Sequence, residues 1–138
     1  MKKKIFVFGH TGYIGSYLLK HLNNEDFVTC GSKIPRPDNV SLYNFYYQFI
    51  SKFLSKNNDI FCIINSAGSI NCQTKEDYFF NSHFDVIFQD VINEKKINIK
   101  YLSFNSTKIF SAALDNYALS KRDLDKNLKD DDMFYSLY

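Results

Sequence analysis

The sequence is poor in the residues that mark stapled or metal-bound proteins. Its 138 residues include no tryptophan, two prolines and three cysteines. The cysteines, at positions 30, 62 and 72, are an odd number and form no Cys-x-x-Cys pair. This argues against a disulfide framework and against a zinc site. We expect reduced thiols in a cytoplasmic protein, with Cys30 and Cys62 buried in strands.

Long apolar runs and an excess of one charge are also missing. Only four apolar residues, 5–8, separate the basic N-terminus from Gly9, which is too short for the core of a secretory signal. No stretch approaches the roughly 18 apolar residues of a membrane helix. The 17 basic and 15 acidic residues leave a net charge of +2, without the basic surface typical of nucleic-acid binding. We therefore expect neither a membrane nor a nucleic acid as a partner.

Apolar residues make up 45% of the chain and follow two alternating patterns. Short β-branched and aromatic runs predict strands at 5–8, 27–30, 60–64 and 99–104 and the start of another at 133–138. Apolar residues at helical spacing predict helices near 14–22, 42–54, 76–93 and 117–128. The segment 35–42 leaves little room for a further strand. This alternation predicts one domain, 1–138, with an open parallel α/β sheet and helices on both faces.

Three glycines follow the first predicted strand, at positions 9, 12 and 15. Gly9 would permit a tight turn, Gly12 would let the backbone approach a pyrophosphate, and Gly15 would let the helix pack closely on the strand. The helix N-terminus would then offer free N–H groups to the phosphates. Glycines in a turn can be merely structural, but their place between a strand and an amphipathic helix favours dinucleotide binding.

This glycine spacing, with Thr11 before Gly12 and the triplet Tyr13-Ile14-Gly15, resembles the short-chain dehydrogenase/reductase superfamily. The similarity is to its extended branch of NAD(P)-dependent nucleotide-sugar epimerases, dehydratases and reductases, and it runs from about residue 4 to 128. The resemblance implies a Rossmann-like doubly wound sheet and hydride transfer on a sugar nucleotide or a related carbonyl or hydroxyl substrate.

Extended members of that superfamily continue into a lobe that contacts the substrate. We expect this chain to lack that C-terminal lobe, so that a homo-oligomer or a partner chain would supply the missing surface. Two functions remain open at this point. One is an enzyme or its cofactor-binding half, and the other is a catalytically incomplete dinucleotide-binding or interaction module.

The end of the second predicted strand bears on the choice of dinucleotide. It carries Ser32, Lys33 and Arg36, and no carboxylate occurs before Asp38. A hydroxyl and two cations suit the 2′-phosphate of NADP, whereas NAD would favour an acidic residue there. The alternative is that these are ordinary solvated loop charges. We predict NADP, with NAD as the second choice.

Two further segments match the resembled family's cofactor site. Ala67 and Gly68, after the strand at 60–64, belong to a segment similar to the family's Asn-x-Ala-Gly, where small residues let the cofactor lie against the backbone. Asn81 matches an asparagine on the following helix. Considered alone, Asn81 would be a polar residue on the helix surface.

Tyr117 and Lys121 are the strongest catalytic candidates. Their spacing places both on one face of a helix, where the ammonium would lower the pKa of the phenol and let it exchange protons. The resemblance implies the same roles, with the lysine also holding the nicotinamide ribose. Chance spacing on a helix is the alternative.

A hydroxyl just past the preceding strand should complete the catalytic set. Residues 105–110 resemble the family's Ser-Ser/Thr-x-x-Val-Tyr/Phe segment, which assigns Ser106 to the substrate oxygen, with Thr107 as the second choice. The alternative is that both hydroxyls only cap or turn the chain.

Overall fold

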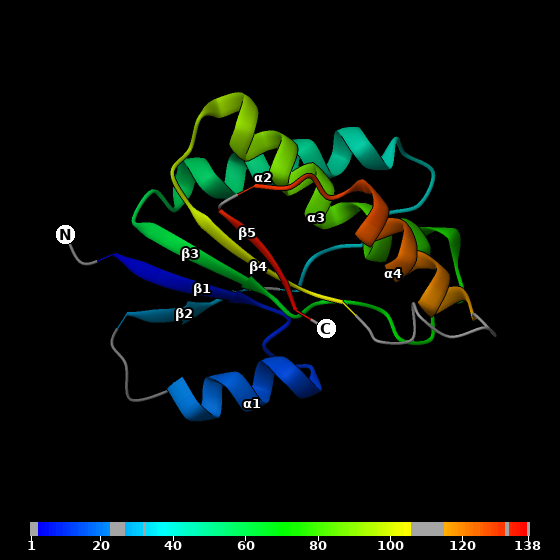
Figure 1. The fold of residues 1–138 in the computed structure, drawn as a ribbon, viewed down its shortest axis with the longest axis horizontal. Helices are drawn as coiled ribbons and strands as arrows, with labels where there is room; N and C mark the ends of the chain where they lie inside the picture. Colours follow the sequence, from blue (N-terminus) through cyan, green and yellow to red (C-terminus); the bar gives the residue numbers. More distant parts are fainter. Residues whose placement is uncertain (1–2, 23–26, 32, 106–114, 132, 138) are drawn as a thin grey trace.

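Strands and helices alternate through the whole chain in the computed structural model, which describes residues 3–22, 27–31, 33–105, 115–131 and 133–137 (Figure 1). In chain order the elements are β1 (Lys4–Phe8), α1 (Tyr13–Leu22), β2 (Val28–Cys30), α2 (Leu42–Lys56), β3 (Ile60–Asn65), α3 (Lys75–Lys95), β4 (Lys100–Phe104), α4 (Asn116–Asn127) and β5 (Phe134–Leu137). The predicted alternation is confirmed.

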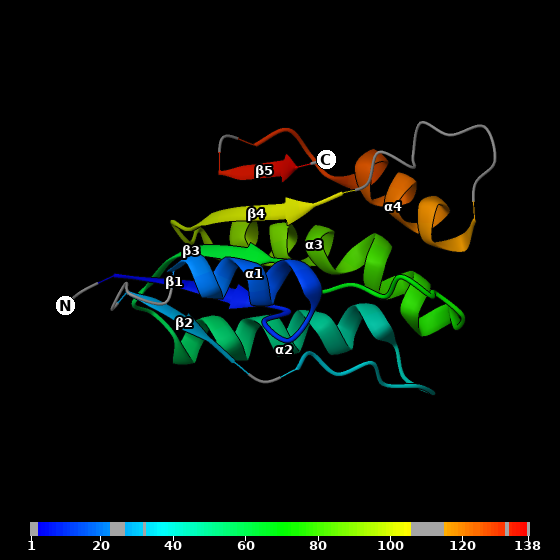
Figure 2. The same ribbon diagram turned by 90° about the horizontal axis from the view of Figure 1, so that it is seen from below.

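The strands form one parallel sheet in the order β2-β1-β3-β4-β5. Helix α1 covers one face and α2 and α3 cover the other, while α4 packs on α3 near the carboxyl end of β4 (Figures 1 and 2). The doubly wound sheet with helices on both faces is therefore confirmed. From β1 the chain runs outward to β2 and then crosses back to β3, so the winding reverses between β1 and β3. Parallel sheets bind ligands beyond the carboxyl ends of their strands at such a point.

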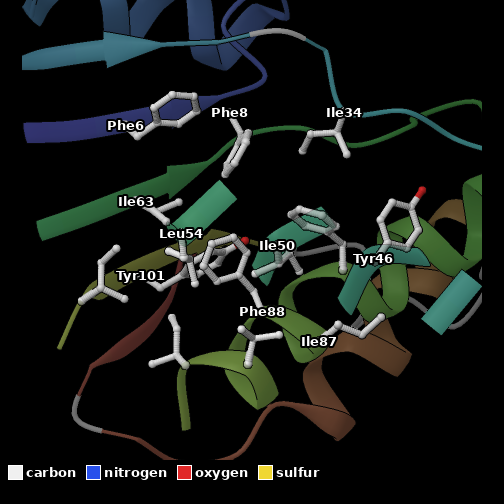
Figure 3. Close-up of a cluster of buried hydrophobic side chains, with 14 of the residues drawn as sticks. Phe6, Phe8, Ile34, Tyr46, Ile50, Leu54, Ile63, Ile87, Phe88 and Tyr101 are labelled. Atoms are coloured by element: carbon white, nitrogen blue, oxygen red, sulfur yellow. The ribbon is translucent and has the colours of Figure 1, made fainter. Parts of the chain in front are cut away.

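The main core lies between the sheet and helices α2 and α3, and it is strongly aromatic. Figure 3 shows side chains from both layers meeting there, among them Phe6, Phe8, Ile63 and Tyr101 from the strands and Ile50, Leu54, Ile87 and Phe88 from the helices. Phe8 packs edge-to-face on Phe84 and Phe88, with ring centroids 6.1 and 6.3 Å apart. Such pairs add to the hydrophobic stabilisation from burial, so the core fixes β1 firmly against α3.

Strand β2 forms an edge of the sheet. Residues 33–41, which follow it, contain no strand, as the shortness of this segment predicted.

Cys62 and Cys72 are buried, but Cys30 is exposed. The prediction of a buried Cys30 was wrong because β2 is an edge strand, paired among the described residues with β1 alone. Among the described residues, no helix is both long and apolar enough to span a membrane.

Candidate active site

The glycine turn lies at the carboxyl end of β1, and two of its glycines are required by packing. Gly9 has a φ of +77°, and a Cβ there would lie 2.5 Å from the Ala67 nitrogen. A Cβ on Gly15, which is buried in α1, would lie 1.9 Å from the Gly9 carbonyl oxygen. Neither distance is sterically possible. The sequence-based roles of Gly9 in the turn and of Gly15 in helix packing therefore agree with the structure.

Gly12 is different, because space remains open beside it. A Cβ there would meet only the Gly9 carbonyl oxygen, at an ordinary 3.4 Å. The N–H of Ser16 donates to the Gly12 carbonyl at 2.9 Å, which is the first hydrogen bond of the helix. The N–H groups of residues 13–15 come before it and are not used within the helix ladder. The turn thus offers an exposed backbone and a helix N-terminus to a ligand, a combination that suits phosphate.

Loops from three strands meet at this turn. A cavity of about 130 Å³ is lined by the glycine turn, by residues that follow β2 and by residues that follow β3, namely Gly9, His10, Thr11, Gly12, Lys33, Ile34, Arg36, Ser66, Ala67 and Gly68. A second cavity of about 310 Å³ shares three of these residues and adds Ser69 and Asp77. The predicted cofactor residues that line these cavities are Gly9, Thr11, Gly12, Lys33, Arg36, Ala67 and Gly68. Six others line neither cavity, namely Tyr13, Ile14, Gly15, Asn81, Tyr117 and Lys121. The side chains of Tyr13 and Ile14 are exposed to solvent.

The two cations of this region have different surroundings. The Arg36 guanidinium lies 3.9 Å from the centre of the Phe80 ring, and its Nε is 3.5 Å from a carboxylate oxygen of Asp77. Lys33 is exposed and borders both cavities. Lys33 is therefore the cation available to a bound anion, and Arg36 is already engaged. Ser32 lies outside the described residues.

The loop after β3 is held by side-chain amides. The Asn65 side-chain oxygen accepts a hydrogen bond from the Ala67 N–H at 3.0 Å. The Asn81 amide bonds both the N–H and the carbonyl of Ser69, each at 2.8 Å. Asn81 is 3% exposed, so its alternative assignment to the helix surface was wrong. Because both ends of its amide are used on the loop, Asn81 positions the cavity wall instead of pointing into the cavity.

A buried carboxylate in α3 was missed by the sequence reading. Asp85 accepts hydrogen bonds from Asn65 at 2.6 Å, from Ser103 at 2.5 Å and from Tyr101. It therefore ties the carboxyl end of β3 to β4. The signal was present in the sequence, because Asn81, Asp85 and Gln89 recur every four residues on a helix whose other buried side chains, except Ser82, are apolar.

Tyr117 and Lys121 lie one turn apart at the start of α4, which is capped by Asp115 accepting from the Ala118 N–H at 2.8 Å. The Lys121 ammonium is buried and donates to the Phe104 carbonyl at 2.9 Å, at the carboxyl end of β4. Burial lowers the pKa of Lys121, and the Asp85 charge opposes this shift.

The expected lowering of the Tyr117 pKa was wrong. Burial, followed by the charge of Asp115, raises the pKa of Tyr117 above its ordinary value. Tyr117 is therefore a protonated phenol at neutral pH, which suits a proton donor. Ser106 and Thr107 lie outside the described residues, so the predicted third member remains a prediction.

No protein-family profile and no curated protein matches the sequence, but solved structures match the fold. The Bordetella bronchiseptica enzyme WbmG in complex with NAD has a TM-score of 0.72 at 14% identity, with 99% of this chain and 52% of that chain covered. The dTDP-4-dehydrorhamnose reductase of Bacillus anthracis in complex with NADP has a TM-score of 0.71 at 14% identity, with 99% of this chain and 52% of that chain covered. A hypothetical dTDP-4-dehydrorhamnose reductase of Sulfolobus tokodaii has a TM-score of 0.65 at 17% identity, with 96% of this chain and 53% of that chain covered.

These likenesses confirm the fold that the resemblance implied. The chain spans about half the length of the structures that it matches.

Proposed function

We propose that this chain binds a nicotinamide dinucleotide, with NADP preferred, as the cofactor-binding part of an extended short-chain dehydrogenase/reductase. The substrate class would be a sugar nucleotide. The observation that carries the proposal is the convergence of the open Gly12 turn, the exposed Lys33 and the segment 66–68 where the winding of the sheet reverses. The names of the matched structures, which include two dTDP-4-dehydrorhamnose reductases and complexes with NAD or NADP, support it.

The residues present fit such a cofactor. The space beside Gly12 and the free N–H groups of α1 suit a pyrophosphate, and Lys33 suits a 2′-phosphate. When bound, the reduced form of the dinucleotide would supply the hydride that reduces the substrate carbonyl, and would leave oxidised. Tyr117 then donates its phenolic proton to the carbonyl oxygen, which yields the alcohol. We assign Lys121 to the nicotinamide ribose and Ser106 to the substrate oxygen.

A second candidate is a dinucleotide-binding module without turnover. It is favoured by Lys121, because its buried ammonium is bonded to the Phe104 carbonyl. The two candidates agree on cofactor binding and differ only in hydride transfer.

Substitution of Tyr117 separates these two candidates. If the chain turns over substrate, Tyr117→Phe is expected to reduce the rate about a hundredfold, because general acid catalysis contributes at least that much. Cofactor affinity should be unchanged. The measurement is NADPH oxidation with dTDP-4-dehydrorhamnose, and Tyr135→Phe on exposed β5 is the matched control. Because the pKa of Tyr117 is raised, the reduction rate should stay level as the pH rises to about its ordinary value of 10.0 and fall only above it. Equal rates in the wild type and Tyr117→Phe would remove the phenol from the mechanism.

The preference for NADP is assigned to Lys33. Lys33→Glu is expected to weaken NADPH binding about tenfold, since a charge-assisted contact to phosphate is lost, with a much smaller effect on NADH. Titration of cofactor fluorescence measures both affinities. Lys20→Glu, an exposed change of the same charge in the last turn of α1, is the control. Tighter binding of NADH than NADPH by the wild-type protein would contradict the assignment.

A further inference from the structure

The outer edge of β2 has unpaired backbone groups. Within the described residues β2 pairs with β1 and with no strand on its other side. The Phe27 carbonyl accepts a hydrogen bond from the Ile5 N–H at 2.7 Å, so this carbonyl points toward β1. In a parallel ladder the backbone groups of every second residue point toward the same neighbouring strand. The N–H and carbonyl groups of Val28 and Cys30 therefore point away from β1. Such an edge is a template for another strand.

An apolar groove runs along this edge, under helix α2. Its volume is about 530 Å³, and four phenylalanine rings line it, those of Phe6, Phe8, Phe49 and Phe53. The Phe53 ring packs edge-to-face on Phe6, with ring centroids 4.7 Å apart. Phe49 and Phe53 are one turn apart on α2 and only partly buried. The groove can thus receive apolar side chains from a strand placed beside β2.

The rim of the groove is basic at both ends. Lys56 lies at the end of α2, close to the amino ends of the strands, with Lys52 one turn before it, and Lys33 follows the carboxyl end of β2. No carboxylate is among the described residues that line the groove. Antiparallel pairing of two β2 strands would bring Lys33 of one copy near Lys56 of the other, and like charges repel. The charges therefore favour an acidic partner over a second copy.

We propose that β2 and this groove bind an extended segment of a partner protein, apolar at its centre and acidic at both ends, by strand addition. Backbone hydrogen bonds to Val28 and Cys30 would hold the segment, and the phenylalanine rings would select its apolar side chains. The lysines would select its acidic ends. Lys33 borders both this groove and the cofactor cavities, so the two sites are adjacent.

Cys30 provides a reporter at the site itself. It lines the groove and is exposed, whereas Cys62 and Cys72 are buried. The probe is the synthetic peptide Glu-Glu-Val-Thr-Val-Glu-Glu, and the measurement is the rate of Cys30 alkylation followed by mass spectrometry. We expect the peptide to slow the alkylation. A copy with N-methylated central amides, or one with lysines in place of the glutamates, should not slow it.

Charge reversal on α2 tests the partner chemistry. Lys52→Glu combined with Lys56→Glu is expected to weaken protection by the acidic peptide about tenfold and to allow protection by the lysine-ended peptide. Lys95→Glu, an exposed change at the end of α3, should alter neither. Equal protection by the N-methylated peptide would overturn strand addition. Protection of Cys30 that grows with protein concentration alone, with self-association in light scattering, would identify a second copy as the occupant and overturn the acidic partner.

Discussion

A Gly12→Ala variant is expected to fold as the wild type does and to lose nicotinamide dinucleotide binding by at least about a hundredfold. The new Cβ would contact only the Gly9 carbonyl oxygen, at 3.4 Å, so the folded protein can accommodate it. The same methyl group would occupy the space where we place the pyrophosphate. Thermal unfolding and cofactor fluorescence, measured on the same preparation, separate the two effects.

Gly15→Ala is the matched control, because it adds the same methyl group three residues later. There the Cβ would lie 1.9 Å from the Gly9 carbonyl oxygen, and backbone must move to admit it. We expect a loss of more than about 3 kcal/mol in the free energy of unfolding. If Gly12→Ala binds NADPH as tightly as the wild type, the pyrophosphate does not lie across this turn.

Asp85→Ala is expected to destabilise the fold by about 4 kcal/mol, a large share of the stability of a domain of this size. The change removes the acceptor of hydrogen bonds from Asn65, Tyr101 and Ser103, all of them buried. Three donors would then be left without a partner in the core. Urea unfolding followed by circular dichroism gives the free energy.

Asp90→Ala provides the comparison on the same helix. Asp90 accepts a hydrogen bond from Tyr43 at 2.9 Å near the surface, where water can replace it. We expect a change of about 1 kcal/mol or less. Equal losses in the two variants would mean that the buried network adds nothing beyond an ordinary surface contact.

The sequence predicted the elements well because each of its signals was local. The apolar runs of the strands, and the apolar residues that recur every three or four positions in α2, are properties of neighbouring residues. The glycine turn between β1 and α1 is likewise recognised from its own three glycines. The space beside Gly12 agrees with the role assigned from the spacing alone. These features do not depend on which distant segment packs against them.

The misplaced features depend on contacts between distant segments. Cys30 was correctly predicted to lie in a strand, but it is exposed because β2 is at the edge of the sheet. The pKa of Tyr117 is raised first by burial, which depends on how α4 packs in the fold. Asn81, considered alone, was expected on the helix surface, but it is buried and its amide is bonded to a loop that precedes α3. Spacing along one helix cannot reveal such partners.

The polar residues of α3 also determine how two loops move. Loops of a globular protein commonly open at a small free-energy cost, independently of the core. Here the backbone of Ser69 is bonded by Asn81, and the backbone of Lys129 by Gln89, at 2.8 and 2.9 Å. Both amides belong to a helix buried in the core, so each loop must break two hydrogen bonds to α3 before it can open. We therefore expect the cavity wall at Ser69 and the approach to β5 to open less readily than loops without such bonds.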